Sequence, residues 1–313
     1  MAKTESLRPE QLSQVLQVVE AASATDGVTA LSDSTLSQLN SSAKDNFEGS
    51  TKDNVGEDAG SIHLLSHSGD EIVGYGYLAA GVGELVVHPT YRRRGLGRQL
   101  AEEAIAAAKH RGAGELRLWA HGQLPGAVRL AEVLGFWPVR TLWQLRRPLS
   151  VESTQLDELK VAAGIRLRRF QPGSDEDVWL ALNRRAFAGH PEQGRWELSD
   201  VIARYNEPWF DAEGFLLAER VADQRLLGFH WTKISRDGPH RGVGEVYVLG
   251  VDPQAHGTGL GRALLVAGLR YLAHHGCVQA MLYLDADNTA AARLYYKLDF
   301  TKTDIDVQYA RST

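Results

Sequence analysis

The stretch Leu249–Arg262 reads LGVDPQAHGTGLGR, and an earlier stretch, Leu85–Arg98, reads LVVHPTYRRRGLGR. The two copies lie 164 residues apart at every matched position. In both copies an apolar run ends at a proline, and Gly-Leu-Gly follows six residues later, where an Ala- and Leu-rich run begins. A long pattern that recurs at one offset indicates an internal duplication. The sequence therefore predicts two domains of the same fold.

The elements around the two copies follow the same order. Each half opens with an amphipathic helix, passes through two β-rich segments into the repeated stretch, and continues with helix, strand and helix. The expected elements are 9–22, 62–65, 72–78, 100–109 and 115–120 in the first half, and 175–187, 215–221, 226–234, 263–274 and 278–284 in the second. This order predicts an α/β fold in which each domain is a mixed, largely antiparallel twisted sheet flanked by helices.

Composition sets the expected domain boundaries and narrows the class of protein. We expect an N-terminal domain over 1–148, a polar linker over 149–164, a C-terminal domain over 165–313, and a mobile loop at Ser41–Gly60. The formal charge of −5 argues against nucleic acid as the partner. The single cysteine, Cys277, and the absence of zinc-type spacing predict no disulfide and no metal. With no apolar stretch of membrane-spanning length, we expect a cytoplasmic monomer without membrane contact.

The repeated turn has the chemistry of an anion site. Glycines let a ligand approach the main chain closely, and the first N–H groups of a helix have no partner within it. Those donors and the helix dipole suit a pyrophosphate. The alternative is a surface turn with solvated arginines, which one copy alone would not exclude. The chain has no Gly-Lys dipeptide for a P-loop, Arg262 stands where a dinucleotide motif needs glycine, and no Gly-x-Ser-x-Gly is present.

These turns, with Asn288, Ala291, Tyr295 and Phe300 downstream, resemble the acyl-CoA-dependent N-acetyltransferases of the GNAT superfamily. The resemblance implies one acetyl-CoA site per domain. The implied contacts in the second half are Leu249, Gly250, Val251, His256, Gly257, Thr258, Gly259, Leu260, Gly261, Arg262, Asn288, Ala291 and Arg293. Those in the first half are Leu85, Val86, Val87, Arg93, Arg94, Gly95, Leu96, Gly97 and Arg98. His256 replaces the usual Gln or Arg, which removes one potential side-chain contact to phosphate.

Three longer segments, 186–194, 228–233 and 244–253, resemble a branch of the superfamily that acetylates the cysteinyl amine of a glucosaminyl-inositol pseudo-disaccharide. The resemblance implies that this small molecule is the second substrate. It also implies substrate contacts at Asp33, Glu192, Lys233, Glu245 and Tyr283. Asp33 has an alternative reading as the cap of the helix that follows it.

The same resemblance implies that Glu245 is the general base and Tyr295 the general acid of a direct acetyl transfer. At the matching positions the first half has Gly81, Leu124 and Ala131 in place of Glu245, Asn288 and Tyr295. We therefore expect the C-terminal site to be productive and the N-terminal site to bind acetyl-CoA without turnover. Glu245 has an alternative interpretation as a surface carboxylate at the start of a strand. Acetylation of another amine, or acyl-CoA sensing without catalysis, are the alternative functions.

Overall fold

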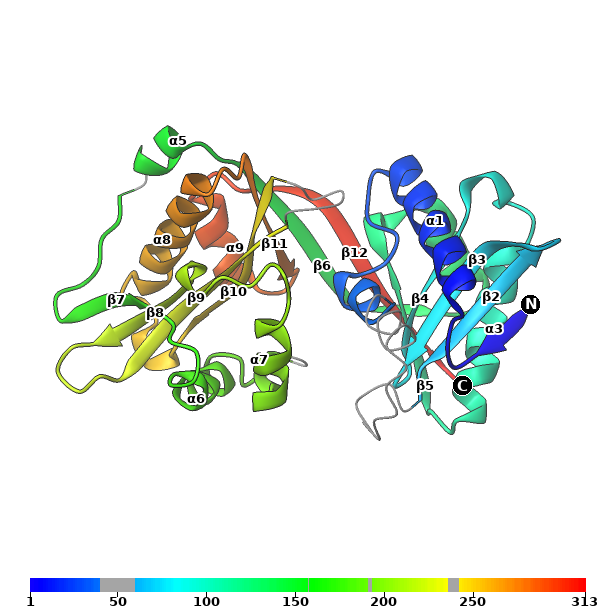
Figure 1. Cartoon of the computed structure of the whole chain (residues 1–313), viewed down its shortest axis with the longest axis horizontal. Helices are drawn as coiled ribbons and strands as arrows, with labels where there is room; N and C mark the ends of the chain where they lie inside the picture. Colours follow the sequence, from blue (N-terminus) through cyan, green and yellow to red (C-terminus); the bar gives the residue numbers. More distant parts are fainter. Residues whose placement is uncertain (40–59, 157, 191–192, 236–241) are drawn as a thin grey trace. The chain divides into compact units, whose positions relative to one another are not determined.

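The computed structural model describes residues 1–39, 60–156, 158–190, 193–235 and 242–313. Apart from Gly60, the loop expected at Ser41–Gly60 lies outside these residues, as does Glu192. The chain divides into two compact units (Figure 1). The N-terminal unit comprises 1–143, 285–287 and 304–313, and the C-terminal unit comprises 144–284 and 288–303.

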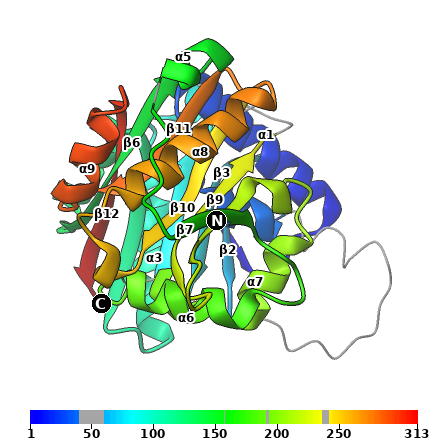
Figure 2. The same cartoon turned by 90° about the vertical axis from the view of Figure 1, so that its left-hand side faces the viewer.

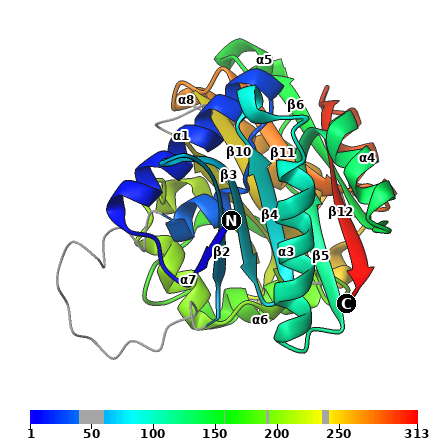
Figure 3. The same ribbon diagram turned by 90° about the vertical axis from the view of Figure 1, so that its right-hand side faces the viewer.

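The N-terminal unit is a sheet in the order β1-β2-β3-β4-β5-β12 with helices packed on it (Figure 3). A short helix over 33–39 also belongs to it. β4 and β5 run parallel, whereas the other pairs recorded for this sheet are antiparallel. In chain order, the elements of the first half are β1 (Ala2–Thr4), α1 (Pro9–Asp26), β2 (Ile62–Ser68), β3 (Glu71–Ala79), β4 (Val82–Val87), η1 (Pro89–Tyr91), α3 (Leu96–His110), β5 (Glu115–Ala120), η2 (His121–Gln123) and α4 (Pro125–Val133), followed by β6 (Trp137–Pro148), which is shared between the units.

The C-terminal unit repeats this arrangement in the order β6-β11-β10-β9-β8-β7 (Figure 2). β10 and β11 run parallel, and β7 to β10 are antiparallel. The elements are α5 (Val151–Leu156), β7 (Ile165–Arg169), α6 (Glu176–Ala186), η3 (Gln193–Arg195), α7 (Leu198–Tyr205), η4 (Ala212–Gly214), β8 (Phe215–Arg220), β9 (Leu226–Ile234), β10 (Val243–Val251), η6 (Pro253–Ala255), α8 (Leu260–His274), β11 (Gln279–Asp285), α9 (Thr289–Tyr296) and β12 (Thr301–Ser312).

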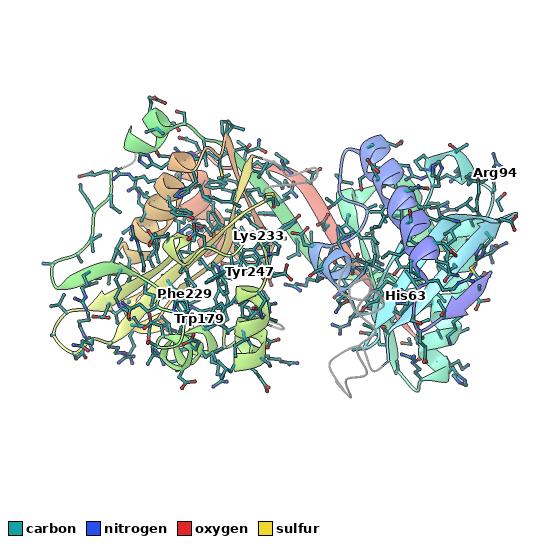
Figure 4. The ribbon with its side chains drawn as sticks, viewed as in Figure 1. His63, Arg94, Trp179, Phe229, Lys233 and Tyr247 are labelled. Carbon is teal, nitrogen blue, oxygen red and sulfur yellow. The ribbon has the colours of Figure 1, made fainter. Side chains whose placement is uncertain are left out.

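Successive side chains of each strand point to opposite faces of the sheet, and each face packs against its own apolar core. In β8, Phe215 and Leu217 pack with α6 and α7, whereas Ala218 packs with α8. The first of these cores is dominated by aromatic rings, including Trp179 and Phe229, which are labelled in Figure 4. The mixed sheets with flanking helices confirm the predicted fold class.

The observed units differ from the boundaries expected from the sequence: the first unit ends at Trp143, within β6, and it also includes 285–287 and 304–313. Strand β12 enters the N-terminal unit, where Val307 to Ser312 pair antiparallel with β5. The segment expected as a linker contains α5, which packs against α8. Apolar periodicity predicts that a segment is a strand or a helix, but it does not predict which other element the segment will contact. The pairing of β12 with β5 and the packing of α5 on α8 were therefore not predictable.

Candidate functional site

The C-terminal glycine turn opens helix α8. Gly259 is the N-cap residue and has φ +82°, a left-handed conformation that favours glycine. The first main-chain bond of the helix joins Ala263 N–H to Gly259 O at 3.1 Å. The N–H groups of Leu260, Gly261 and Arg262 precede that bond, and a Cβ built on Gly257 or Gly259 meets open space. The turn therefore has the donors and the room that a pyrophosphate requires.

The N-terminal turn has the same construction at the start of α3. Gly95 is the N-cap residue with φ +87°, and Gln99 N–H bonds Gly95 O at 3.0 Å. The expected cationic contacts Arg93, Arg94 and Arg98 are exposed around this turn. Arg94, labelled in Figure 4, lies over the Tyr91 ring at 5.3 Å. Both units thus present the backbone of an anion site.

His256 and Arg92 fasten the two turns to their strands. His256 Nε2 donates to Val251 O at 3.1 Å, and Arg92 Nε donates to Val87 O at 3.1 Å. Arg92 is also held by Asp26 through two bonds of 2.6 and 2.7 Å. These side chains stabilise the turn itself, so the histidine at position 256 keeps the contact that the arginine makes in the other unit.

Strand β10 separates from β11 before the turn. The recorded parallel pairs run from Val243 to Glu245, opposite Gln279 to Met281. The main chain at Leu249–Val251, expected to meet the acyl chain, lies beyond the last of these pairs. β4 and β5 behave alike, with pairs recorded from Val82 to Glu84. The two strands therefore stop pairing ahead of the turn in both units, and the contact of Leu249–Val251 with acetyl-CoA stays a prediction.

A β-bulge at Tyr247 changes the correspondence between the two units. Val246 lies opposite Thr232 and Val248 opposite Trp231, so Tyr247 is the extra residue. β3 and β4 pair without interruption. When the two units are matched by their strand pairing, Glu245 corresponds to Val82. The residue at the 164-residue offset, Gly81, is not its counterpart, because the bulge adds one residue to β10. Neither residue supplies a carboxylate.

Glu245 lies directly opposite Lys233 across β9 and β10. Lys233 Nζ is 3.7 Å from Glu245 Oε2, and the side chains are only 11% and 13% exposed. Two of the predicted substrate-binding residues are thus brought together. At this burial a carboxylate and an ammonium interact far more strongly than on an open surface.

Aromatic residues that the sequence did not single out lie close to Lys233. Lys233 Nζ lies 5.4 Å from the Trp209 ring centre and 5.8 Å from that of Tyr247. Lys233 and Tyr247 lie beside one another in Figure 4. The Tyr247 hydroxyl accepts a bond of 2.9 Å from Arg204 Nε. Burial raises the pKa of Tyr247, against the opposing effect of Arg204. The position of Tyr247 beside Lys233 depends on the β-bulge, which the sequence does not reveal.

The two tyrosines of α9 have different environments. Tyr295 is 7% exposed and Tyr296 45%. The Tyr295 ring packs edge-on against Phe300 with 5.6 Å between ring centres. Burial raises the pKa of Tyr295, so its hydroxyl keeps its proton at neutral pH. A protonated phenol is the form that a general acid needs.

Helix α9 begins at a side-chain cap. Asn288 Oδ1 accepts from Ala291 N–H at 3.1 Å. This contact positions the first turn of the helix, so Asn288 has a structural role whatever it does for acetyl-CoA. Arg293, further along α9, is exposed.

The other predicted substrate residues are placed as follows. Tyr283 is 39% exposed on β11, and its hydroxyl accepts from Gln144 Nε2 at 3.1 Å. Asp33 is exposed and is the first residue of the helix over 33–39. That helix is capped by Ser32, whose Oγ accepts from Thr35 N–H at 3.3 Å, and not by Asp33.

A buried charged cluster lies in the N-terminal unit. His121 Nδ1 is 3.2 Å from Asp306 Oδ2, and Nε2 is 3.8 Å from Glu84 Oε1. Burial works to lower the pKa of His121, but the two carboxylates raise it to about 10. Burial works to raise the pKa of Glu84, and His121 and the Ser32 N–H hold it below its usual value. His121 and Glu84 are therefore both charged at neutral pH.

Cys277 is buried, and burial raises the pKa of its thiol to about 11, which fits a packing role. Within the described ranges there is no group of three or more potential metal ligands. In the same part of the chain, no helix has the length and apolar character needed to cross a bilayer.

Comparison with known proteins identifies the family of this chain. The profile of the Acetyltransferase (GNAT) family matches residues 29–136 and 177–300. The chain therefore belongs to the GNAT acetyltransferase family and is an acetyl-CoA-dependent N-acetyltransferase. Within that family it groups with proteins named mycothiol acetyltransferase. It is 48% identical to one from Thermobispora bispora over 311 residues, covering 97% of each chain. It is 47% identical to one from Salinispora arenicola over 321 residues, covering 100% of this chain and 97% of the relative.

Solved structures share the fold at low identity. A tandem GNAT protein from the clavulanic acid biosynthesis pathway has a TM-score of 0.75 at 18% identity, covering 99% of this chain and 97% of that one. A GCN5-related N-acetyltransferase from Sphaerobacter thermophilus has a TM-score of 0.71 at 21% identity, covering 99% and 95%. At this identity the likeness concerns architecture alone.

Proposed function

We propose that this enzyme transfers the acetyl group of acetyl-CoA to the cysteinyl amine of cysteinyl-glucosaminyl-inositol, the last step of mycothiol formation. The observation that carries the proposal is the similarity to mycothiol acetyltransferases, which at 48% identity spans 97% of both chains. The partly buried Glu245–Lys233 pair adds a base and a cation in one place. Lys233, Tyr283, Asp33 and Glu192 would recognise the polar substrate, Glu192 lying outside the described residues.

Glu245 would act as general base. An amine substrate is protonated at neutral pH and must lose a proton before its nitrogen can attack the thioester carbonyl. Glu245 lies at the last recorded β10–β11 pair, where the two strands begin to separate. A carboxylate there accepts the ammonium proton, directly or through one water molecule. Main-chain N–H groups of Leu249–Val251 would meet the carbonyl oxygen as negative charge develops on it.

Tyr295 would act as general acid. Collapse of the tetrahedral intermediate breaks the carbon–sulfur bond and leaves a CoA thiolate. The buried hydroxyl of Tyr295 retains its proton at neutral pH and can give it to that sulfur. The acetyl group goes directly to nitrogen, so no acyl-enzyme is needed.

Catalysis would belong to the C-terminal unit, with one acetyl-CoA site in each. The N-terminal unit has the anion-binding turn at Gly95. It has Val82 at the position of the base, and Ala131 and Leu124 stand where the second half has Tyr295 and Asn288. The N-terminal site would therefore bind acetyl-CoA without turnover.

A panel of acceptor amines tests the assignment. With acetyl-CoA as donor and thiol release as the signal, kcat/KM should be far higher for cysteinyl-glucosaminyl-inositol than for an aminoglycoside or a peptide N-terminus. Equal values for all three would favour a GNAT enzyme acting on another amine. Binding of acetyl-CoA with no turnover of any acceptor would favour the acyl-CoA sensor.

A further inference from the structure

The Lys233 ammonium lies near two aromatic rings that belong to other parts of the C-terminal unit. Its ammonium lies 5.4 Å from the centre of Trp209, in the segment between α7 and η4, and 5.8 Å from that of Tyr247 on β10. Both distances are within the range of about 6 Å in which a ring face attracts a cation. The two rings also contact each other, with 5.0 Å between centres and planes at 60°. Lys233 is thus attracted to two rings as well as to Glu245.

The Tyr247 ring is in turn fixed by Arg204 on α7. Arg204 Nε donates to the Tyr247 hydroxyl at 2.9 Å, and Nη1 donates to Asp200 O at 2.8 Å. The guanidinium stacks on Trp196, with Cζ 3.7 Å from the ring centre. Arg204 therefore has three contacts of defined geometry. Trp196, Arg204, Tyr247 and Trp209 make up what we call the aromatic stack.

The separation between Lys233 and Glu245 has a chemical consequence. At 3.7 Å the ammonium and the carboxylate attract each other but are beyond hydrogen-bond distance. A carboxylate that receives a direct hydrogen bond from an ammonium is a weaker proton acceptor, because that bond favours its charged form. The rings of Trp209 and Tyr247 also attract the ammonium at its present position.

We propose that the aromatic stack is a positioning device for the active site, which holds the Lys233 ammonium near Glu245 without letting it form a direct hydrogen bond to the base. This inference rests on the proposed role of Glu245 as general base. Trp209, Tyr247 and Arg204 are positioning residues here, since they act on the base through Lys233. The cation stays close to the Glu245 carboxylate, which remains able to take a proton from the acceptor amine.

A double-mutant cycle between Trp209 and Lys233 tests the coupling. Trp209→Leu should lower kcat about tenfold at saturating substrates, a part of the 10²–10⁴-fold typical of a general base. The KM for acetyl-CoA should not change. In a Lys233→Met background the same substitution should alter kcat less than about twofold, because no ammonium remains to move. Trp137→Leu, a change of the same size at a side chain that is 43% exposed in the N-terminal unit, is the control and should leave kcat unchanged.

Two kinetic outcomes would overturn the inference. One is an equal fall in kcat with and without Lys233, which would make Trp209 a packing residue. The other is a rise confined to the KM of the amine, which would make the ring a substrate contact. A wild-type enzyme that acetylates no amine would instead count against the proposed function.

A crystal structure of Trp209→Leu tests the same inference without turnover. The ammonium of Lys233 should move from 3.7 Å to within about 3.2 Å of a Glu245 oxygen. An ammonium that remains in place would overturn the inference whether or not the enzyme is active.

Discussion

Arg92 and His256 make the same contact in the two units: each donates from its side chain to the carbonyl of the last residue of the strand before the turn. His88 and Asp252, one residue after each strand, also correspond. Each accepts the N–H two residues ahead, at 3.3 Å from Thr90 and 3.0 Å from Gln254. The duplicated stretch thus keeps its hydrogen bonds while its side chains differ. A difference in catalysis between the two units must therefore come from residues outside these shared hydrogen bonds.

Matched substitutions in the two turns test the division of labour. Gly95 and Gly259 have φ +87° and +82°, and a Cβ on either meets open space. Valine costs about 1–2 kcal/mol of backbone strain at both positions, so effects on folding should match. Gly259→Val should lower turnover about 10²-fold or more by displacing acetyl-CoA. Gly95→Val should leave most of the activity.

Steady-state kinetics compares the turnover of Gly95→Val with that of Gly259→Val. Unfolding curves of both variants check that their stabilities are equal. A folded Gly95→Val enzyme without turnover would show that the N-terminal site is needed for catalysis.

Replacing Tyr295 tests the general acid. Tyr295→Phe removes only the hydroxyl and preserves the ring contact with Phe300. We expect kcat to fall about 10²-fold while acetyl-CoA affinity changes little. Tyr296→Phe, at the exposed neighbour, is the control and should have no effect. If Tyr295→Phe retains the wild-type kcat, the proton for the thiolate comes from another group.

The helices and strands whose bounds were expected from the sequence match the observed elements to within four residues at each end, because their apolar periodicity is local. No bounds were expected for β1, the helix over 33–39, β6, α5, β7, α7 and β12. Strand β9 at Leu226–Ile234 coincides with the expected segment. The pairing of β12 with β5, and the bulge that moves the counterpart of Glu245 to Val82, required long-range contacts and were not predictable.

The candidate site was predictable only in part. Lys233 and Glu245 were both expected as substrate contacts, and the structure brings them together. The aromatic stack was not expected, since Arg204 on α7 and Trp209 after it lie outside the repeated stretch at 249–262.

The buried cluster of the N-terminal unit should make stability depend on pH at the alkaline side. The pKa of His121 is raised to about 10 from 6.5, so its contribution is fully present below about pH 6.5 and is lost as pH rises through about 10. The lowered pKa of Glu84 gives a contribution present above its usual range and lost as pH falls through the folded value.

Urea unfolding of wild type and His121→Gln between pH 6 and 10 measures how the free energy of unfolding depends on pH. The free energy of unfolding should decline more steeply with pH in wild type, and the variant should be less stable by a few kcal/mol at pH 6. His110→Gln, at an exposed position, is the control. Parallel pH curves for wild type and His121→Gln would mean that the histidine is not charged in the fold.

The pH dependence of Glu245→Gln tests most directly whether the C-terminal unit transfers acetyl with Glu245 as base. The variant should have a kcat about 10²–10⁴-fold below wild type at neutral pH, with little change in acetyl-CoA affinity. Its rate should then recover as pH rises, because the acceptor amine loses its proton to solvent. A variant with the wild-type rate at neutral pH would contradict the account and show that Glu245 is only a strand-start carboxylate.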